Sequence, residues 1–227
     1  MSRRKDARDA TPPHAAPRRG RSVLANTCDD RFEREAAAEG TVPVAGADEV
    51  GRGALFGPVV AGAVILGEGF DWTGLNDSKK LTAKVRTELA ARVLERAQAW
   101  AIGIASVEEI DRLNIRGATH LAIRRAVADL PVEPRLVLVD GLDEPLATIP
   151  QKAIVGGDGL SVSIAAASII AKVRRDSMIE DWDARCPGFG LKENKGYGSA
   201  MHLEALRIHG PTPFHRKSFI ERTGWLF

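Results

Sequence analysis

The chain has 227 residues, of which 44% are hydrophobic and 27% are charged, and its formal net charge is +2. This composition excludes a wholly disordered chain and predicts one globular domain with enough apolar material for a core. No apolar run is long enough to cross a bilayer and no secretory hydrophobic segment follows the start, so we expect a cytoplasmic protein. Cys28 and Cys186 fit no metal-ligand spacing and are expected to be free thiols.

The charge is unevenly distributed along the chain. Residues 1–21 carry seven basic and two acidic side chains (+5), which leaves −3 for the other 206 residues. Three prolines among basic and small residues predict a disordered tail, and we assign residues 1–40 to this tail and a linker and residues 41–227 to the folded domain. We favour a solvated extension for the tail over the alternative, sequence-independent binding to nucleic-acid phosphates.

The expected elements alternate between strands and helices. In chain order they are a short exposed helix at 31–39, strands at 42–47 and 58–66, a helix at about 82–98, a strand at 99–105, a short helix that opens at the capping box of Ser106 and Glu109, a helix at 117–130, strands at 135–139 and 153–155, and helices at 161–182 and 199–208. Residues 164–173 are apolar on every side, which predicts a central buried helix. The order predicts an α/β domain with a mixed sheet covered on both faces.

Four acidic residues lie at the ends of predicted strands or just before the buried helix. They are Asp48, Glu49, Asp140 and Asp158. Burying charge is costly unless it is compensated, so we expect either raised pKa values or a divalent cation where these residues converge. Oxygen ligands without His or Cys select Mg²⁺ or Mn²⁺. Taken singly, each carboxylate has the alternative role of capping a turn or a helix.

An ordered set of motifs resembles ribonuclease HII, the bacterial type 2 ribonuclease H. The motifs occupy residues 48–53, 57–60, 77–81, 139–141, 157–176, 194–198 and 210–219. One such motif would be weak evidence for the family. The set in the family's order is specific evidence, and it covers about residues 43–220. The departures are small: Gly156 stands where the family often has Lys, and Phe189 where it often has Tyr.

The resemblance implies a ribonuclease H-like mixed sheet flanked by helices, with a helical C-terminal extension. It implies an endonuclease that hydrolyses the RNA strand of RNA–DNA hybrids and nicks duplex DNA at embedded ribonucleotides, leaving 5′-phosphate and 3′-hydroxyl ends. By matching motif positions, Asp48, Glu49, Asp140 and Asp158 become the catalytic carboxylates of a two-metal centre that holds Mn²⁺ or Mg²⁺.

The same motif positions imply a set of substrate-binding residues. They are Gly51, Arg52, Gly53, Lys79, Lys80, Lys172, Tyr197 and Arg216. Glycines let the backbone approach a ribose closely, and the basic side chains would contact phosphates. Tyr197 would contact the ribose at the DNA–RNA junction. Arg174 and Arg175 are further candidates for phosphate contacts, with a solvated helix face as an equal alternative. His202, His209 and His215 are expected to be structural or surface histidines.

Two other functions stay open. One is a different two-metal nuclease or resolvase on the same fold, because a fold does not fix its substrate. The other is a non-catalytic hybrid-binding protein, which gains nothing from acids that face phosphates. The apolar C-terminus at 224–227 either packs on the protein's own core, which we favour, or docks on a replication sliding clamp. We expect a monomer that does not bind membranes.

Overall fold

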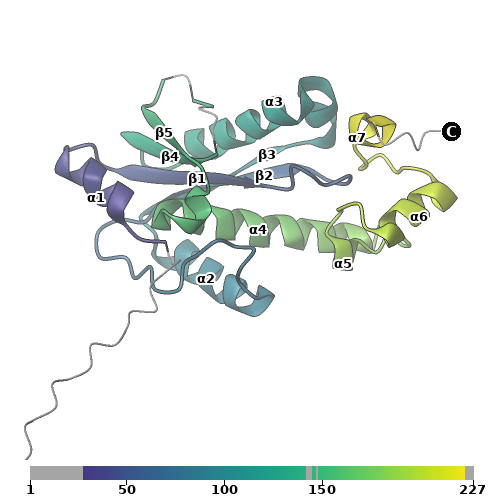
Figure 1. Cartoon of the computed structure of the whole chain (residues 1–227), viewed down its shortest axis with the longest axis horizontal. Coiled ribbons are helices and arrows are strands. Elements are labelled where there is room, and N and C mark those ends of the chain that lie inside the picture. Colours follow the sequence, from purple (N-terminus) through teal and green to yellow (C-terminus); the bar gives the residue numbers. More distant parts are fainter. Residues whose placement is uncertain (1–27, 142–144, 147, 223–227) are drawn as a thin grey trace, which may run out of the picture.

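The computed structural model describes residues 28–141, 145–146 and 148–222. Its centre is a five-stranded sheet in the order β3–β2–β1–β4–β5 (Figure 1). The strands are β1 (Val44–Val50), β2 (Val59–Ile65), β3 (Ala99–Ala105), β4 (Leu136–Asp140) and β5 (Gln151–Ile154). The β1–β2 and β2–β3 pairs are antiparallel, and the β1–β4 and β4–β5 pairs are parallel. The mixed sheet confirms the predicted α/β class.

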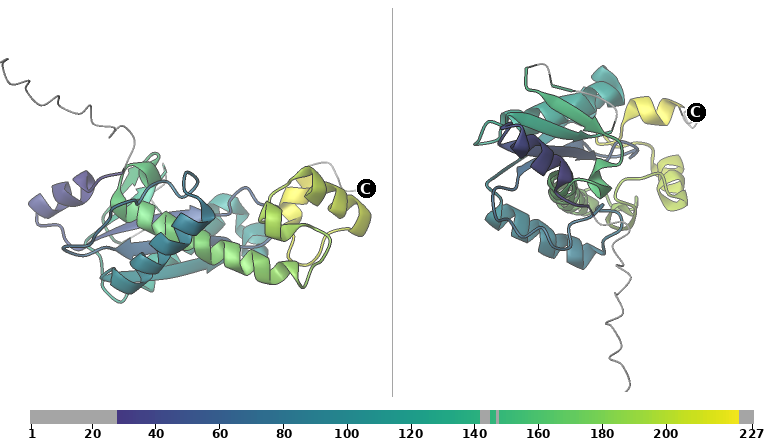
Figure 2. Two further views of the ribbon diagram at one scale, coloured as in Figure 1. Left: turned by 90° about the horizontal axis from the view of Figure 1, so that it is seen from below. Right: turned by 60° about the vertical axis from the view of Figure 1, so that its left-hand side comes forward.

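Helices cover both faces of the sheet. They are α1 (Arg31–Ala38), α2 (Ala83–Arg96), α3 (Val107–Ala128), α4 (Val162–Asp183), α5 (Leu191–Asn194), α6 (Ala200–His209) and α7 (Lys217–Arg222), with a 3₁₀ turn, η1 (Gly157–Gly159). Helix α3 lies on one face, and α4 lies on the other with α2 packed beneath it (Figures 1 and 2). No helix within the described residues is long and apolar enough to cross a membrane.

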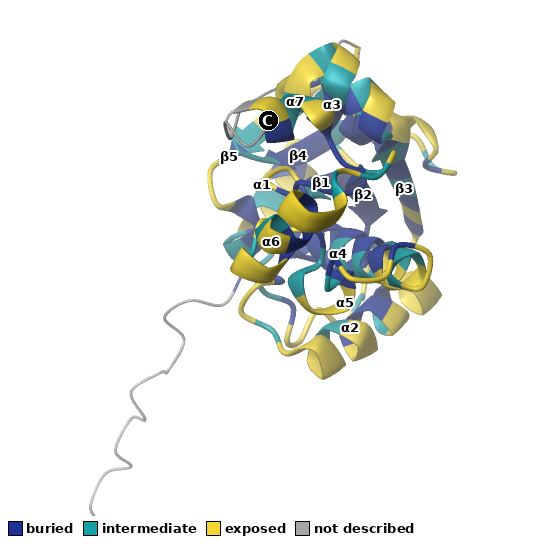
Figure 3. Ribbon diagram, turned by 90° about the vertical axis from the view of Figure 1, so that its right-hand side faces the viewer, coloured by how far each residue is buried: buried dark blue, intermediate teal, exposed yellow. Residues whose placement is uncertain are grey.

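Helix α4 is the buried centre of the domain, as its all-round apolar composition predicts. All residues from 162 to 171 are buried, and the strands it covers are buried as well (Figure 3). Two glycines permit the close approach: a Cβ at Gly46 of β1 would overlap the main chain of Ser163, and a Cβ at Gly62 of β2 would overlap that of Ala167. The helix therefore lies directly on the strand that carries the first acidic pair.

The packed part begins earlier than residue 41, the expected start of the domain. Cys28 is 1% exposed, and Phe32 of α1 packs against a core cluster. The Glu33 carboxylate accepts hydrogen bonds from Ser161 Oγ at 2.6 Å and from Ser163 N at 3.0 Å, at the start of α4. Residues 28–40 thus belong to the domain, because apolar and polar contacts both tie them to it. The part of the predicted tail at residues 1–27 lies outside the described residues.

Several element boundaries differ from the sequence-based expectation. Strand β1 continues to Val50, past the expected end at 47, so Asp48 and Glu49 lie on the strand. The capping box of Ser106 and Glu109 is present, but the two helices expected after it form one element, interrupted at Asn114 by a positive φ of 61°. The short helices α5 and α7 were not expected, since neither is long enough to show a hydrophobic period.

Candidate active site

The four predicted carboxylates lie at one edge of the sheet. Strands β1 and β4 are parallel neighbours, and their register pairs Ala47 with Val139. Asp48 and Asp140 are the next residues on each strand, so the parallel pairing brings their positions side by side. Asp158 lies in η1, between β5 and α4. The sheet topology therefore brings these strand ends together, which is the condition on which the expected cation site depends.

The positive charges near the site do not fully compensate its carboxylates, because the pKa values of three of them are raised. Burial raises the pKa of Asp48 well above its usual value, and the negative charges of Glu49 and Asp140 raise it further. Burial also raises the pKa of Glu49, although the Arg52 guanidinium opposes the shift. The pKa of Asp158 is raised by burial and then by the charge of Asp140. Each of these carboxylates would be stabilised in its charged form by a cation.

Each carboxylate accepts a hydrogen bond from its own local donor. The pairs are Glu49 N to Asp48 at 2.7 Å, Arg52 Nη1 to Glu49 at 3.3 Å, Gly157 N to Asp140 at 2.6 Å and Lys79 Nζ to Asp158 at 3.5 Å. Within residues 28–141, 145–146 and 148–222, no group of three or more His, Cys, Asp or Glu side chains is arranged to hold a metal ion as it stands. The four neighbouring carboxylates are therefore stabilised by four separate donors and share no common one.

Two serines that the sequence reasoning missed link this edge to the lysine loop. Ser168 of α4 hydrogen-bonds to the Asp48 carboxylate, which opposes the rise in its pKa. The Ser168 hydroxyl lies 3.0 Å from that of Ser78, and both side chains are buried. The available signal was a hydroxyl within an all-apolar helix, because a buried polar group needs a partner.

The loop after β1 and the Tyr197 loop lie next to each other. Gly51 has a φ of +92°, and a Cβ there would overlap the Arg175 guanidinium, so the position requires glycine. A Cβ at Gly53 would lie 4.0 Å from Tyr197 Cε1. Arg52, Gly53 and Tyr197 are exposed. The structure thus brings Arg52, Gly53 and Tyr197 together on an open surface, whereas Gly51 is buried against the Arg175 guanidinium.

The predicted phosphate contact by Arg216 is wrong. Its side chain is 0% exposed. Its Nε donates to Gly57 O, its Nη1 to Arg52 O and its Nη2 to Gly51 O, each at 2.8 Å. The planar fork of the guanidinium matches three carbonyls of one loop. Arg216 therefore holds the loop from behind and is not available to substrate.

Arg175 of α4 has a similar role, so the alternative of a solvated helix face is also wrong for it. It is 0% exposed and donates to Pro58 O at 3.2 Å, to Lys195 O at 2.8 Å and to Phe56 O at 3.0 Å. These bonds tie the segment after Gly53 to the segment before Tyr197. Two buried guanidiniums, both bound to carbonyls, therefore shape the surface loops.

The predicted lysines occupy two different environments. Lys79 and Lys80 are exposed on the loop beside Asp158. Lys172 is half-buried and pairs with Asp176 at 2.7 Å, and burial lowers the pKa of its amine. All three lysines are in ion pairs, Lys79 with Asp158 at 3.5 Å and Lys80 with Asp77 at 3.8 Å, but only Lys79 and Lys80 are exposed enough to exchange these long contacts for a phosphate.

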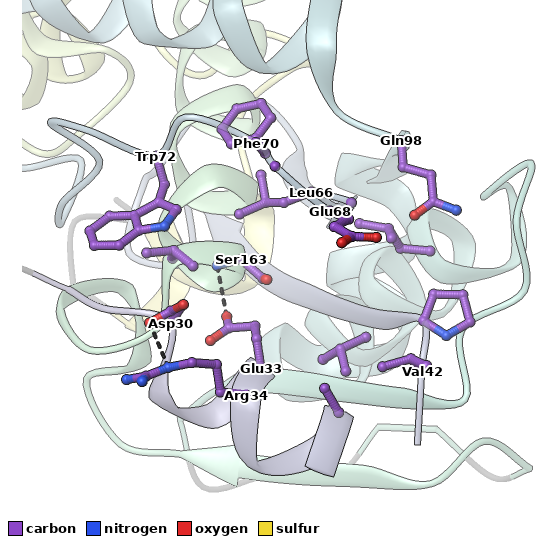
Figure 4. A pocket seen from close by; sticks show the side chains of 17 residues that line it. Asp30, Glu33, Arg34, Val42, Leu66, Glu68, Phe70, Trp72, Gln98 and Ser163 are labelled. Atoms are coloured by element: carbon purple, nitrogen blue, oxygen red, sulfur yellow. Dashed lines mark hydrogen bonds and ion pairs between the residues drawn. The ribbon is translucent and has the colours of Figure 1, made fainter. Parts of the chain in front are cut away.

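A pocket of about 610 Å³ lies at the opposite end of β1. Val42, Leu66, Phe70 and Trp72 are among its lining residues (Figure 4). Val42 precedes the first residue of β1, whereas the carboxylates follow from the other end of the strand. The pocket contains none of the predicted site residues, so it does not take part in the acidic site.

Comparisons with known proteins agree with the motif set. Residues 45–225 match the family model described as ribonuclease HII. A ribonuclease HII of Rhizorhabdus wittichii is 54% identical over 178 residues, which are 78% of this chain and 88% of that protein.

Solved structures show the same fold. The crystal structure of ribonuclease H2 from Pyrococcus horikoshii OT3 gives a TM-score of 0.66 at 26% identity, and the match covers 80% of this chain and 96% of that one. Ribonuclease HII of Archaeoglobus fulgidus, solved in complex with PCNA, gives a TM-score of 0.69 at 24% identity over 82% and 97% of the two chains. The second likeness concerns the fold alone.

Proposed function

The chain belongs to the ribonuclease HII family, whose members are hydrolases of the RNA strand in RNA–DNA hybrids, and from this premise we propose how its own residues perform the reaction. We propose that it cleaves hybrids by two-metal catalysis and nicks duplex DNA at embedded ribonucleotides. The observation that carries the proposal is the convergence of Asp48, Glu49 and Asp140 at the ends of two parallel strands.

The donor set fits a hard divalent cation. The family is dependent on divalent metal ions, and the four acids offer oxygen ligands without His or Cys, as Mg²⁺ or Mn²⁺ requires. Asp48, Glu49, Asp140 and Asp158 would hold the ions, and to do so they would turn from their present local donors. When bound, the ions supply an activated water and stabilise the leaving 3′-oxygen. Ser168 would keep the Asp48 carboxylate oriented during this exchange.

The exposed loops would read the substrate. The 2′-hydroxyl distinguishes RNA from DNA and lies in the shallow minor groove of a hybrid. The backbone of Gly51 and Gly53 can approach the ribose, and Arg52 can bind the adjacent phosphate once it leaves Glu49. Tyr197 lies beside Gly53 and would pack on the sugar at the junction. Lys79 and Lys80 would contact the phosphates near Asp158.

One gel assay tests the function. The substrates are an RNA–DNA hybrid, a DNA duplex with a single ribonucleotide, an all-DNA duplex and an all-RNA duplex, each with Mg²⁺, Mn²⁺ or EDTA. We expect cleavage of the first two, only with metal, leaving 5′-phosphate ends. Cleavage of all-DNA would favour a resolvase-like nuclease, and hybrid binding without cleavage would favour a binding protein.

The proposed partners are RNA–DNA hybrids and ribonucleotide-containing DNA. We propose that the protein binds them as a monomer in the cytoplasm. The clamp prediction rests on residues 224–227, which lie outside the described residues. We keep the core-packing alternative as the favoured one, with a truncation after Thr223 as the test. A lower melting temperature supports core packing, whereas unchanged stability with loss of co-migration with a sliding clamp supports docking.

A further inference from the structure

Two histidines lie in contact behind the Tyr197 loop. His202 of α6 is 0% exposed, His215 is 1% exposed, and their Nε2 atoms are 3.0 Å apart. The other nitrogen of His202, Nδ1, lies 2.9 Å from the Tyr197 carbonyl oxygen. The Nδ1 of His215 lies 3.0 Å from Thr212 N and 2.9 Å from Thr212 Oγ1. The two rings therefore form one continuous chain between two backbone groups.

The two ends of this chain fix where every proton lies. A carbonyl can only accept, so His202 Nδ1 carries a proton and donates it to Tyr197 O. A backbone N–H can only donate, so His215 Nδ1 is unprotonated and accepts from Thr212 N. Each neutral ring has one proton, which leaves His202 Nε2 as an acceptor and His215 Nε2 as the donor to it. The Tyr197 carbonyl and the Thr212 N–H independently indicate the same direction of hydrogen-bond donation, from Thr212 toward Tyr197.

The chain disfavours an additional proton. A proton on His215 Nδ1 would break the bond from Thr212 N and leave Thr212 Oγ1, 2.9 Å away, as its acceptor, and one on His202 Nε2 would face the N–H of His215. The aromatic rings of Phe56 and Phe189 each lie 4.9 Å from the His215 ring, so the imidazole is packed between apolar groups. The pair is therefore a neutral connector with one fixed direction.

The segment that the connector reaches has an unusual backbone. Lys195 is a non-glycine residue with a φ of +51°, and Gly196 has a φ of +81°. A Cβ at Gly196 would lie 2.9 Å from Phe56 O. Such a conformation persists only when its surroundings hold it. Arg175 holds the Lys195 carbonyl, and His202 holds that of Tyr197.

We propose that His202 and His215 are positioning residues for substrate cleavage, which set the orientation of Tyr197 by holding its carbonyl through a directed hydrogen-bond chain. The proposal rests on the proposed function, because Tyr197 acts on the ribose there. The histidines touch neither substrate nor metal. Their effect reaches the reaction through one peptide group.

Three substitutions at one position separate this role from simple packing. The amide nitrogen of His202→Asn can replace Nδ1 and donate to Tyr197 O, whereas the amide of His202→Gln can replace Nε2 and reach only His215. His202→Phe keeps a ring and loses both bonds. We expect single-turnover cleavage of a single-ribonucleotide duplex to fall about 5- to 150-fold for Gln and Phe, which lose the bond to the Tyr197 carbonyl, and to fall less for Asn, which keeps that bond and loses only the link to His215. His209→Gln, on the exposed end of α6, is the matched control.

A double substitution shows whether the effect passes through Tyr197. In a Tyr197→Ala chain, His202→Gln should cause no further loss, because the group it positions is absent. An equal loss in both backgrounds, or equal cleavage by the Asn and Gln variants in chains that melt alike, would overturn the proposal.

Nitrogen-15 NMR of the histidines tests the connector without activity. At neutral pH we expect His202 protonated at Nδ1 only and His215 at Nε2 only. The reverse tautomers, or a doubly protonated ring, would overturn the proposal even if the enzyme cleaves. A wild-type chain that cleaves no hybrid would instead refute the proposed function, and the NMR assignment would then decide the connector by itself.

Discussion

Replacing Arg216 by lysine separates a loop-holding role from a phosphate-binding role. Arg216 donates three hydrogen bonds of 2.8 Å to the carbonyls of Gly51, Arg52 and Gly57, and it is fully buried. Lysine keeps the charge, but its single ammonium group cannot reproduce the three hydrogen bonds that the guanidinium donates to separate carbonyls. Each hydrogen bond to a charged group contributes about 1.5–3 kcal/mol, so losing two lowers the free energy of unfolding by about 3–6 kcal/mol.

Thermal and urea unfolding measure this loss directly. For a chain of this size we expect the melting temperature of Arg216→Lys to fall by at least about 6 °C. The matched control is Arg52→Lys, since Arg52 is exposed and its substitution should leave the melting temperature unchanged. Were Arg216 a phosphate contact, lysine would preserve stability and the salt dependence of hybrid binding. An Arg216→Lys chain that melts like wild type would refute the reasoning.

Three further predictions concern the acids, the tail and the histidine pair. Asp48→Asn and Asp140→Asn should abolish cleavage and keep hybrid binding, and Asp48→Asn should also raise the melting temperature, because it removes a buried, repelled charge; gel assays and calorimetry measure both. Deleting residues 1–21 should leave the cleavage position unchanged, and a shallower slope of log K against log salt would show that the tail contacts phosphates. Burial lowers the pKa of His215 to about 4. As the pH falls, the unfolded chain therefore binds a proton at His215 before the folded chain does, so the free energy of unfolding should decline between about pH 6.5 and pH 4. The decline should be smaller in His215→Gln.

The sequence predicts those parts of the site that depend on local pattern. The apolar run of β4 ends at Asp140, and β1 carries Asp48, so two buried parallel strands deliver both acids to one edge whatever the surrounding loops do. The capping box of Ser106 and the apolar circumference of α4 are local in the same sense. The strand before Asp140, the capping box and the buried helix were confirmed because hydrophobic period and local capping depend on nearby residues, whereas the role of the acids stays a prediction.

The misassigned residues are those whose partners are distant backbone carbonyls. An arginine in a sequence indicates a charged side chain, and charged side chains are mostly exposed. Arg216 and Arg175 are buried because each finds three carbonyls in folded loops, an environment that has no sequence signature. His202 and His215 were expected to be structural or surface histidines, and both are buried in structural positions; the fold adds the contact between their Nε2 atoms. A residue type shows which bonds it can form, whereas the tertiary fold decides which of them it forms.

The site has two parts, one positioned by the strands of the sheet and one positioned by residues of the C-terminal region. The carboxylate edge is produced by β1 and β4 inside the sheet. The loop at Gly51, which we propose faces the substrate, is held by Arg216, which lies 165 residues later in the chain and donates to the Gly51 carbonyl. Partial unfolding of α6 and the segment up to Arg216 would therefore release the loop and Tyr197 together, while the acids keep their places on the sheet. We infer that ribose recognition depends on the C-terminal region and metal binding on the sheet, so that damage to the former impairs substrate discrimination first.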